Sequence, residues 1–423
     1  MSQPNECKHS DYKLCFKLKQ HTPIIHFQAD QKGATLRATE LKPKLDRFLM
    51  EYFEEENERR KESGEELIDY EKFLIAGQER AFDYKVRIEE HNEVAPFIEE
   101  SNFLGNMDKN KKKLSEKYSK GITFISITSF QSNLITAIKE IMPSFLLQTN
   151  FGARTSKGYG SFYLFDSIND TYCSPDFSFV NKRVYKFKSI KEKCIDDIKL
   201  LNNFFRSGIN LPCSTYSQKD EEKDSKHKKG TLKRGCPKII SPEKGTRVYI
   251  KSALYNYLND KTDFTWDKKK IKHKFKPMNE NIEDDSRATL ARDLFGLSSR
   301  QEWQTEKGKM IITKDNKHFS RLKSPIFFKP LISEDVITKA NSEVIVTFWA
   351  NDSYKDMLGK TFTIKSNDRN GFPLSTPIDF SFDDFFDYIV NEYTPIVDRN
   401  FENQPEIIAI KRMLADIKEF AND

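Results

Sequence analysis

The sequence has no long apolar run. No segment approaches the roughly 20 consecutive apolar residues that a membrane-spanning helix needs. The N-terminal stretch MSQPNECKHSDYK is polar and lacks the apolar core of a secretion signal. We therefore expect a cytoplasmic protein that makes no contact with a membrane.

Cysteine is scarce, and its spacing has no pattern. The 423 residues include six cysteines without any C-x-x-C pair, namely Cys7, Cys15, Cys173, Cys194, Cys213 and Cys236. This scatter argues against a disulfide framework and against a zinc site, because both use characteristic spacings. There is also no convincing pair of carboxylates for two-metal nuclease chemistry. We expect reduced thiols, and neither a metal nor a cofactor.

A strong imbalance of charge is missing as well. The chain has 70 basic and 64 acidic residues, a formal net charge of +6, so the distribution of charge matters more than the total. Lysines gather in two runs, 109–120 and 261–276, and the polar segment 217–234 has little apolar content. We interpret all three segments as exposed loops, with Lys111–Lys113 available for non-specific phosphate contacts.

What the first 165 residues do contain is a regular succession of strand and helix patterns. Apolar residues alternate along 12–19 and recur at helical spacing from Leu41 onward. The predicted elements are, in order, strand 12–19, a helix from Glu40, strands 83–89 and 121–128, helix 132–148 and strand 160–165. This β-α-β-β-α-β order is the ferredoxin-like, or RRM-like, arrangement, in which two helices cover one face of an antiparallel sheet.

The rest of the chain fits a second module of this kind more loosely. The predicted elements are strands 180–189, 324–331, 342–350 and 360–366, and helices 190–205, 247–258, 382–393 and 404–420. The length is sufficient for two domains with their own cores. We therefore predict an α+β fold of two ferredoxin-like modules, residues 1–170 and residues 171–423, the second with large basic insertions.

The sharpest local signal is a glycine-rich segment before the last strand of the first module. It reads Phe151-Gly-Ala-Arg-Thr-Ser-Lys-Gly-Tyr-Gly-Ser-Phe162. Glycines allow positive φ and close backbone approach, and exposed amides beside two cations can hold a phosphate backbone. The segment is not a Walker loop, because it lacks G-K-[ST] and follows a helix. From this chemistry alone, a turn that only connects two elements is equally compatible.

The motif G-x-R-x-x-x-G-x-G-x-F in this position resembles the signature of the RAMP superfamily, the ferredoxin-like RNA-binding proteins of CRISPR systems. Thr22–Phe27 and Thr35–Arg47 extend the resemblance upstream. Leu294–Leu297 and Ser324–Phe328 repeat it faintly in the second half, where Arg369–Phe372 is the one candidate for a second glycine loop. The two modules together most resemble the first-numbered subunit of the type III-B Cmr effector complex.

The resemblance implies a non-catalytic subunit that contacts guide or target RNA and caps an antiviral ribonucleoprotein beside other Cmr-type subunits. For RNA binding we expect the loop residues and the start of the first helix, namely Gly152, Arg154, Lys157, Gly158, Tyr159, Gly160, Arg37, Lys42 and His26. Tyr159 is the candidate for base stacking. Arg37 and Lys42 lie where an anion would also meet free helix amides, whereas Lys44 is expected to be solvated.

Two alternatives stay open. RAMP proteins that mature CRISPR RNA often have a general-base histidine in the region of His26, where it deprotonates a 2′-hydroxyl without a metal. No second histidine or lysine partner for such an endoribonuclease is evident. A scaffold that binds only neighbouring proteins would use none of these residues.

Overall fold

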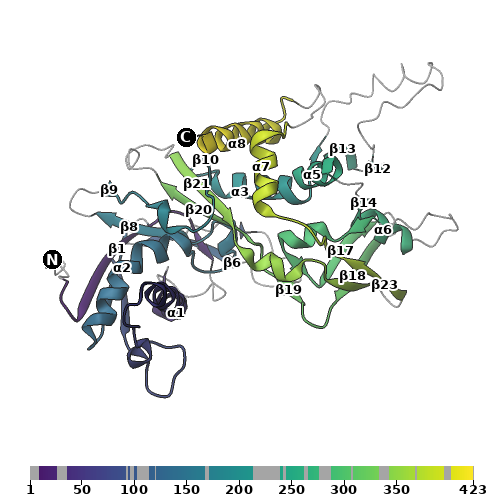
Figure 1. Cartoon of the computed structure of the whole chain (residues 1–423). Helices are drawn as coiled ribbons and strands as arrows, with labels where there is room; N and C mark the ends of the chain where they lie inside the picture. The colour runs from purple at the N-terminus through teal and green to yellow at the C-terminus, as the bar shows by residue number, and fades with distance from the viewer. Residues whose placement is uncertain are drawn as a thin grey trace, which may run out of the picture. The chain divides into compact units, whose positions relative to one another are not determined.

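A computed structural model gives the structure of the chain (Figure 1). The residues that it describes are 9–25, 36–91, 94–95, 100–101, 114–119, 121–166, 171–212, 239–241, 244–261, 265–275, 287–305, 308–332, 343–366, 369–394 and 402–422. Contacts divide the chain into two compact units. The first unit is Met1–Asp196 with Ile326–Trp349, and the second unit is Asp197–Pro325 with Ala350–Asp423. The predicted division of the chain at residue 170 stays a prediction.

The main sheet of the first unit is antiparallel and is built from the N-terminal elements. These are, in chain order, β1 (Lys13–Gln20), α1 (Ala38–Ser63), β3 (Lys85–His91), β7 (Ile122–Thr128), α2 (Ser132–Gln148), β8 (Phe162–Asp166) and β9 (Thr171–Tyr172). The strands lie in the order β3-β7-β1-β8-β9. The α+β class is therefore confirmed, and so are the strands and helices expected in the first 165 residues.

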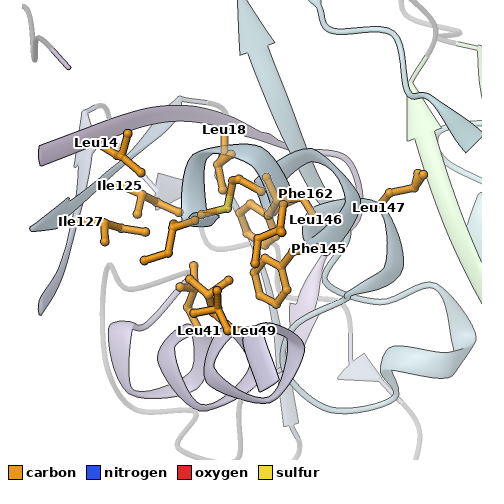
Figure 2. Packing of buried hydrophobic residues seen from close by; sticks show 14 of the residues in the cluster. Leu14, Leu18, Leu41, Leu49, Ile125, Ile127, Phe145, Leu146, Leu147 and Phe162 are labelled. Atoms are coloured by element: carbon orange, nitrogen blue, oxygen red, sulfur yellow. The ribbon is translucent and has the colours of Figure 1, made fainter. Parts of the chain in front are cut away.

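The core of this unit follows directly from the alternation in its strands (Figure 2). Leu14 and Leu18 of β1 share a face and are both buried, as is Ile127, which lies opposite Leu14 on β7. Leu41 and Phe145 contribute from α1 and α2. Burial of one such side chain stabilises the fold by about 1.5–3 kcal/mol, so this cluster fixes both helices on one face of the sheet.

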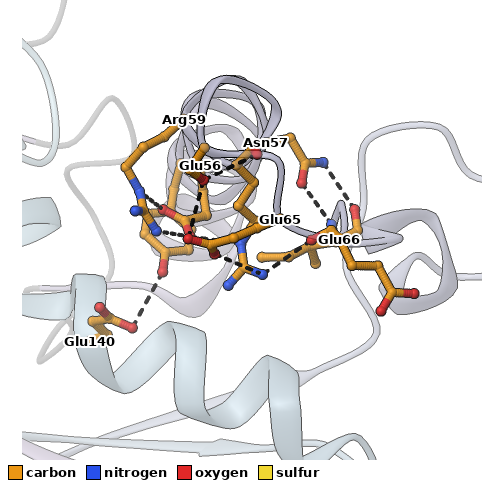
Figure 3. Close-up of polar contacts among 10 residues, drawn as sticks. Glu56, Asn57, Arg59, Glu65, Glu66 and Glu140 are labelled. Carbon is orange, nitrogen blue, oxygen red and sulfur yellow. Dashed lines mark hydrogen bonds and ion pairs between the residues drawn. The ribbon is translucent and has the colours of Figure 1, made fainter.

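The far end of α1 is held by polar contacts (Figure 3). Tyr52 donates to Glu140 of α2 at 3.3 Å, and Glu56 accepts hydrogen bonds from Arg59 and Arg60 one turn later. The start of α1 differs by two residues from the prediction, because the helix begins at Ala38 and not at Glu40. The second helix, α2, was predicted at 132–148, and that range is confirmed.

Two smaller sheets complete the first unit. One contains β10 (Tyr185–Ile190), β21 (Glu343–Ala350) and β20 (Ile326–Ile332) in that spatial order. The other contains β2 (Ile24–Ile25), β6 (Leu114–Ser119) and β4 (Val94–Ala95), with β5 (Glu100–Ser101) also paired to β6. The expectation of a loop over 109–120 was thus wrong for 114–119, which form β6; Lys111–Lys113 lie outside the described residues.

The second unit combines short sheets with helices. Its strands are β11 (Ile209–Pro212), β12 (Ile239–Ser241), β13 (Lys244–Ile250), β14 (Thr265–Trp266), β15 (Ala288–Thr289), β16 (Leu297–Ser298), β17 (Arg300–Thr305), β18 (Gly308–Asp315), β19 (Arg321–Leu322), β22 (Thr361–Ser366) and β23 (Arg369–Ser375). Its helices are α5 (Ala253–Lys261), α6 (Asp267–Lys274), α7 (Phe382–Asn391) and α8 (Pro405–Asn422), and most of α3 (Cys194–Arg206) belongs to it. Aromatic rings such as Phe295, Phe382 and Phe385 pack edge to face in its core.

Three predictions for the second half are corrected. The helix expected at 247–258 is strand β13 up to Ile250 and helix α5 from Ala253, because Val248 and Ile250 pair with β11. The run 261–276 contains helix α6, which the buried Ile271 anchors. Arg369–Phe372 is part of strand β23 and not a glycine loop; a Cβ at Gly371 would lie 2.7 Å from Thr363 Cγ2 of the paired strand. Residues 217–234 lie outside the described residues.

Two further findings concern the cysteines and the membrane. Cys15 is disulfide-bonded, which corrects the expectation of a reduced thiol at that position, whereas Cys173 and Cys194 are not in a disulfide. Within the described ranges, no helix is both long and apolar enough to cross a lipid bilayer.

Candidate functional site

The glycine-rich segment connects α2 to β8, and its backbone requires glycine at several points. Gly152, Gly158 and Gly160 have φ of +82°, +80° and +69°. A Cβ at Gly160 would lie 1.8 Å from the Phe151 carbonyl oxygen, and one at Gly152 would lie 2.6 Å from the Ile25 carbonyl oxygen. The glycines therefore allow this loop to fold tightly on itself and against β2.

Arg154 adopts the same left-handed conformation without being glycine. Its φ is +56° and its ψ is 32°, and it is the one non-glycine residue with positive φ in the described part of the chain. For an ordinary residue this conformation costs about 1–2 kcal/mol, and such strain concentrates at ligand sites. A 3-10 turn, η2 (Thr155–Lys157), follows at once, so Arg154 and Lys157 flank one turn and are both half-buried.

The segment directly after β1 fixes this loop through several hydrogen bonds. Thr22 Oγ1 donates to the Gly158 carbonyl at 2.5 Å and accepts from the Ser161 amide at 3.0 Å. The Gly160 and Ala153 amides donate to the carbonyls of Pro23 and Ile25, each at 2.8 Å. The upstream motif Thr22–Phe27 and the glycine loop thus lie together as far as Ile25, the last residue described there.

The first turn of α1 is the second support of the loop. Glu40 Oε1 accepts hydrogen bonds from the Gly152 amide and from the Lys44 ammonium. Lys44 also donates to the Asn150 carbonyl at 2.8 Å and lies over the Phe151 ring. The expectation that Lys44 is solvated was therefore wrong. Because α1 begins at Ala38, Glu40 and Lys44 face the loop one helical turn apart.

The structure places Lys42 in a different environment from the one expected. Its ammonium donates to both carboxylate oxygens of Asp46, at 3.1 and 3.0 Å, and to the Phe82 carbonyl at 2.8 Å. It also lies 3.9 Å from the centroid of the Tyr84 ring. A lysine has three donor hydrogens, and these acceptors can use them all. This geometry favours a structural role for Lys42, whereas Arg37 is half-buried at the N-cap of α1.

Two other predicted residues have different outcomes. Tyr159 is only 1% exposed and packs in a cluster with Ile25 and Ala153. Its ring therefore offers no face to a nucleobase in this structure, which corrects the expectation of base stacking. His26 lies outside the described residues.

Strand β20 contacts the glycine loop, although no sequence pattern connected the two segments. Strand β20 carries Lys329, which is fully buried, and Ile332, whose amide donates to Nδ1 of His21 at 2.8 Å. Burial lowers the pKa of both Lys329 and His21, and nearby lysines lower the two pKa values further. A lone lysine in an apolar strand was the one available signal for Lys329; nothing local connected it with the glycine loop.

Comparison with known protein families gives two matches. A family model described as the Cmr1 N-terminal domain matches residues 11–209, and one described as the Cmr1 C-terminal domain matches residues 249–418. Together they cover well over half of the chain. No curated protein matches it.

Proposed function

The chain belongs to the Cmr1 family, the Cmr1 subunits of the type III-B CRISPR effector complex, and from this membership we propose a non-catalytic subunit that binds RNA through its glycine loop. It contacts guide or target RNA and caps the complex beside other Cmr subunits. The observation that carries this proposal is Arg154, whose left-handed conformation the loop maintains at a cost in free energy.

The topology of the first unit supports this function. The β-α-β-β-α-β order is formed by β1, α1, β3, β7, α2 and β8. In the sheet, the four strands lie side by side in the order β3-β7-β1-β8. We take this as a ferredoxin-like module, and we assign the divergent remainder to a second one. In the first module the loop precedes the last strand, next to the end of β1.

The proposed RNA contacts are the Arg154 and Lys157 side chains and the backbone of Gly152, Gly158 and Gly160. Cations beside a tightly folded backbone suit a phosphodiester, which carries one charge per nucleotide. Arg37, at the N-cap of α1, completes the set. Lys42 is left out of it, because Asp46 and the Phe82 carbonyl already engage its ammonium.

The experiment is RNA binding by the purified chain and by Arg154→Ala/Lys157→Ala, in EDTA over a salt series. For single strands the slope of log K against log salt is about −0.7 per phosphate neutralised. The double variant should therefore bind more weakly, with a slope that is shallower by about 1.4. The matched control is Arg59→Ala/Lys72→Ala, which removes one exposed arginine and one exposed lysine of the same unit.

The same gels distinguish the alternatives. Cleavage of repeat RNA in EDTA that His26→Ala abolishes would replace the proposal with an endoribonuclease. Equal affinities of wild type and the loop variant at low salt would leave a scaffold that binds only proteins.

A further inference from the structure

Lys329 is a buried lysine whose ammonium contacts mostly backbone carbonyls. It lies in β20 with 0% of its surface exposed. Its ammonium donates to the carbonyls of Leu146 at 2.6 Å, Thr149 at 2.9 Å and Phe162 at 3.0 Å, and to Asn150 Oδ1 at 3.3 Å. These acceptors lie at the end of α2 and the start of β8, which are the two ends of the glycine loop.

The charge of Lys329 has no acidic partner among the described residues. The contrast is Lys314, the other fully buried lysine described, whose ammonium lies 2.5 Å from the Asp293 carboxylate. Neutral carbonyls stabilise a buried cation less than a carboxylate does, and burial lowers the pKa of Lys329 accordingly. Burying the Lys329 ammonium without a carboxylate costs free energy, and we therefore expect this residue to have a role beyond apolar packing.

Asn150 connects Lys329 to the turn that carries the two loop cations. Its Oδ1 accepts from Lys329, while its Nδ2 donates to the Thr155 carbonyl at 2.8 Å and to the Phe328 carbonyl of β20 at 2.9 Å. Thr155 directly follows Arg154. At the other end of the loop, Ser161 Oγ donates to the Pro330 carbonyl at 2.7 Å. Strand β20 thus holds both ends of the loop through hydrogen bonds.

We infer that Lys329 is a positioning residue for RNA binding, which holds Arg154 and Lys157 in their binding geometry through Asn150 and does not itself touch RNA. The inference rests on the proposed function. It also means that the loop, within the region matched by the Cmr1 N-terminal domain, depends on a strand within the region matched by the C-terminal domain.

The test is a double-mutant cycle with the full chain and a fluorescent, unstructured single-stranded RNA. Lys329→Met should weaken binding by about tenfold, which is within the usual range of coupling between contacting residues. In the Arg154→Ala/Lys157→Ala background, Lys329→Met should cause no further loss of affinity, because it acts through those two side chains. Lys329→Arg, which keeps the charge, should restore at least part of the affinity.

A merely structural role gives a different pattern. The losses from Lys329→Met and from the loop variant would then be additive, or a folded Lys329→Met would bind RNA as wild type does; either result overturns the inference. Lys314→Met is the control, expected to lower the melting temperature without changing the affinity of the folded protein. If Lys329→Met does not fold, Asn150→Ala replaces it in the same cycle, since it breaks the connection and leaves Lys329 three carbonyl acceptors. If Arg154→Ala/Lys157→Ala by itself binds RNA as tightly as wild type does, the result contradicts the proposed function and not only the inference about Lys329.

Discussion

His21 should make the stability of this protein depend on pH in a predictable way. The side chain is 2% exposed, and its Nδ1 accepts the Ile332 amide, so the folded state holds a neutral imidazole. Burial, followed by the charges of Lys329, Lys191 and Lys19, lowers the histidine pKa well below its usual 6.5. In the unfolded chain the same imidazole takes up a proton near that usual value.

The sign follows from proton linkage. Below about pH 6.5 the unfolded state binds one proton more than the folded state does, so the free energy of unfolding falls as the pH falls. For one proton the slope reaches about 1.4 kcal/mol per pH unit, until the pH reaches the lowered pKa of the folded state. Above pH 6.5 both states are neutral at this position, and the stabilisation is fully present.

The assay is urea unfolding between pH 5 and pH 8 for wild type and His21→Asn, whose amide oxygen can accept the same Ile332 amide. The advantage of wild type over His21→Asn should shrink by about 1.4 kcal/mol per pH unit below pH 6.5. His318→Asn, at an exposed position, is the control and should track wild type. A gap between wild type and His21→Asn that stays constant from pH 5 to pH 8 would refute this reasoning.

Three further predictions concern the loop. Gly160→Ala should lower the free energy of unfolding by more than about 2 kcal/mol, because the new Cβ meets a carbonyl oxygen at 1.8 Å. The control Gly64→Ala, at a φ of +74° with open space around it, should lower it by only about 1 kcal/mol. Equal losses of the two variants in thermal melting would contradict this prediction. Lys44→Met should lower stability by about 1 kcal/mol in urea titrations, since two hydrogen bonds from a half-buried ammonium are lost; no loss would indicate a solvated lysine. Arg154→Gly should leave stability equal or higher by relieving the left-handed strain while weakening RNA binding, and a clear drop in melting temperature would show that the arginine is structural.

Sequence patterns predicted the first module well because its signals are local. Alternation in β1 and helical spacing in α1 and α2 depend only on which face is buried. The glycines predict a turn from the local sequence alone. The same logic failed at 247–258, where apolar residues of a strand and of a helix follow each other within a few residues.

The roles of individual side chains around the loop were harder to predict. Lys42 and Lys44 lie about 200° apart around α1, and their partners, the Phe82 and Asn150 carbonyls, are distant in sequence, so the helical pattern alone did not show which lysine faces the loop. The contact between Lys329 and Asn150 spans 179 residues of sequence, and no spacing rule reaches that far. Tyr159 appeared available in the sequence, yet close packing with Ile25 buries it.

The central claim is that the glycine loop contacts RNA, and photo-crosslinking tests it most directly. A single-stranded RNA containing 4-thiouridine would be irradiated with the full chain, and the crosslinked peptides would be identified by mass spectrometry. Crosslinks are expected in residues 150–161 and should disappear in Arg154→Ala/Lys157→Ala. Crosslinks that fall only elsewhere, or that persist unchanged in the double variant, would contradict the claim.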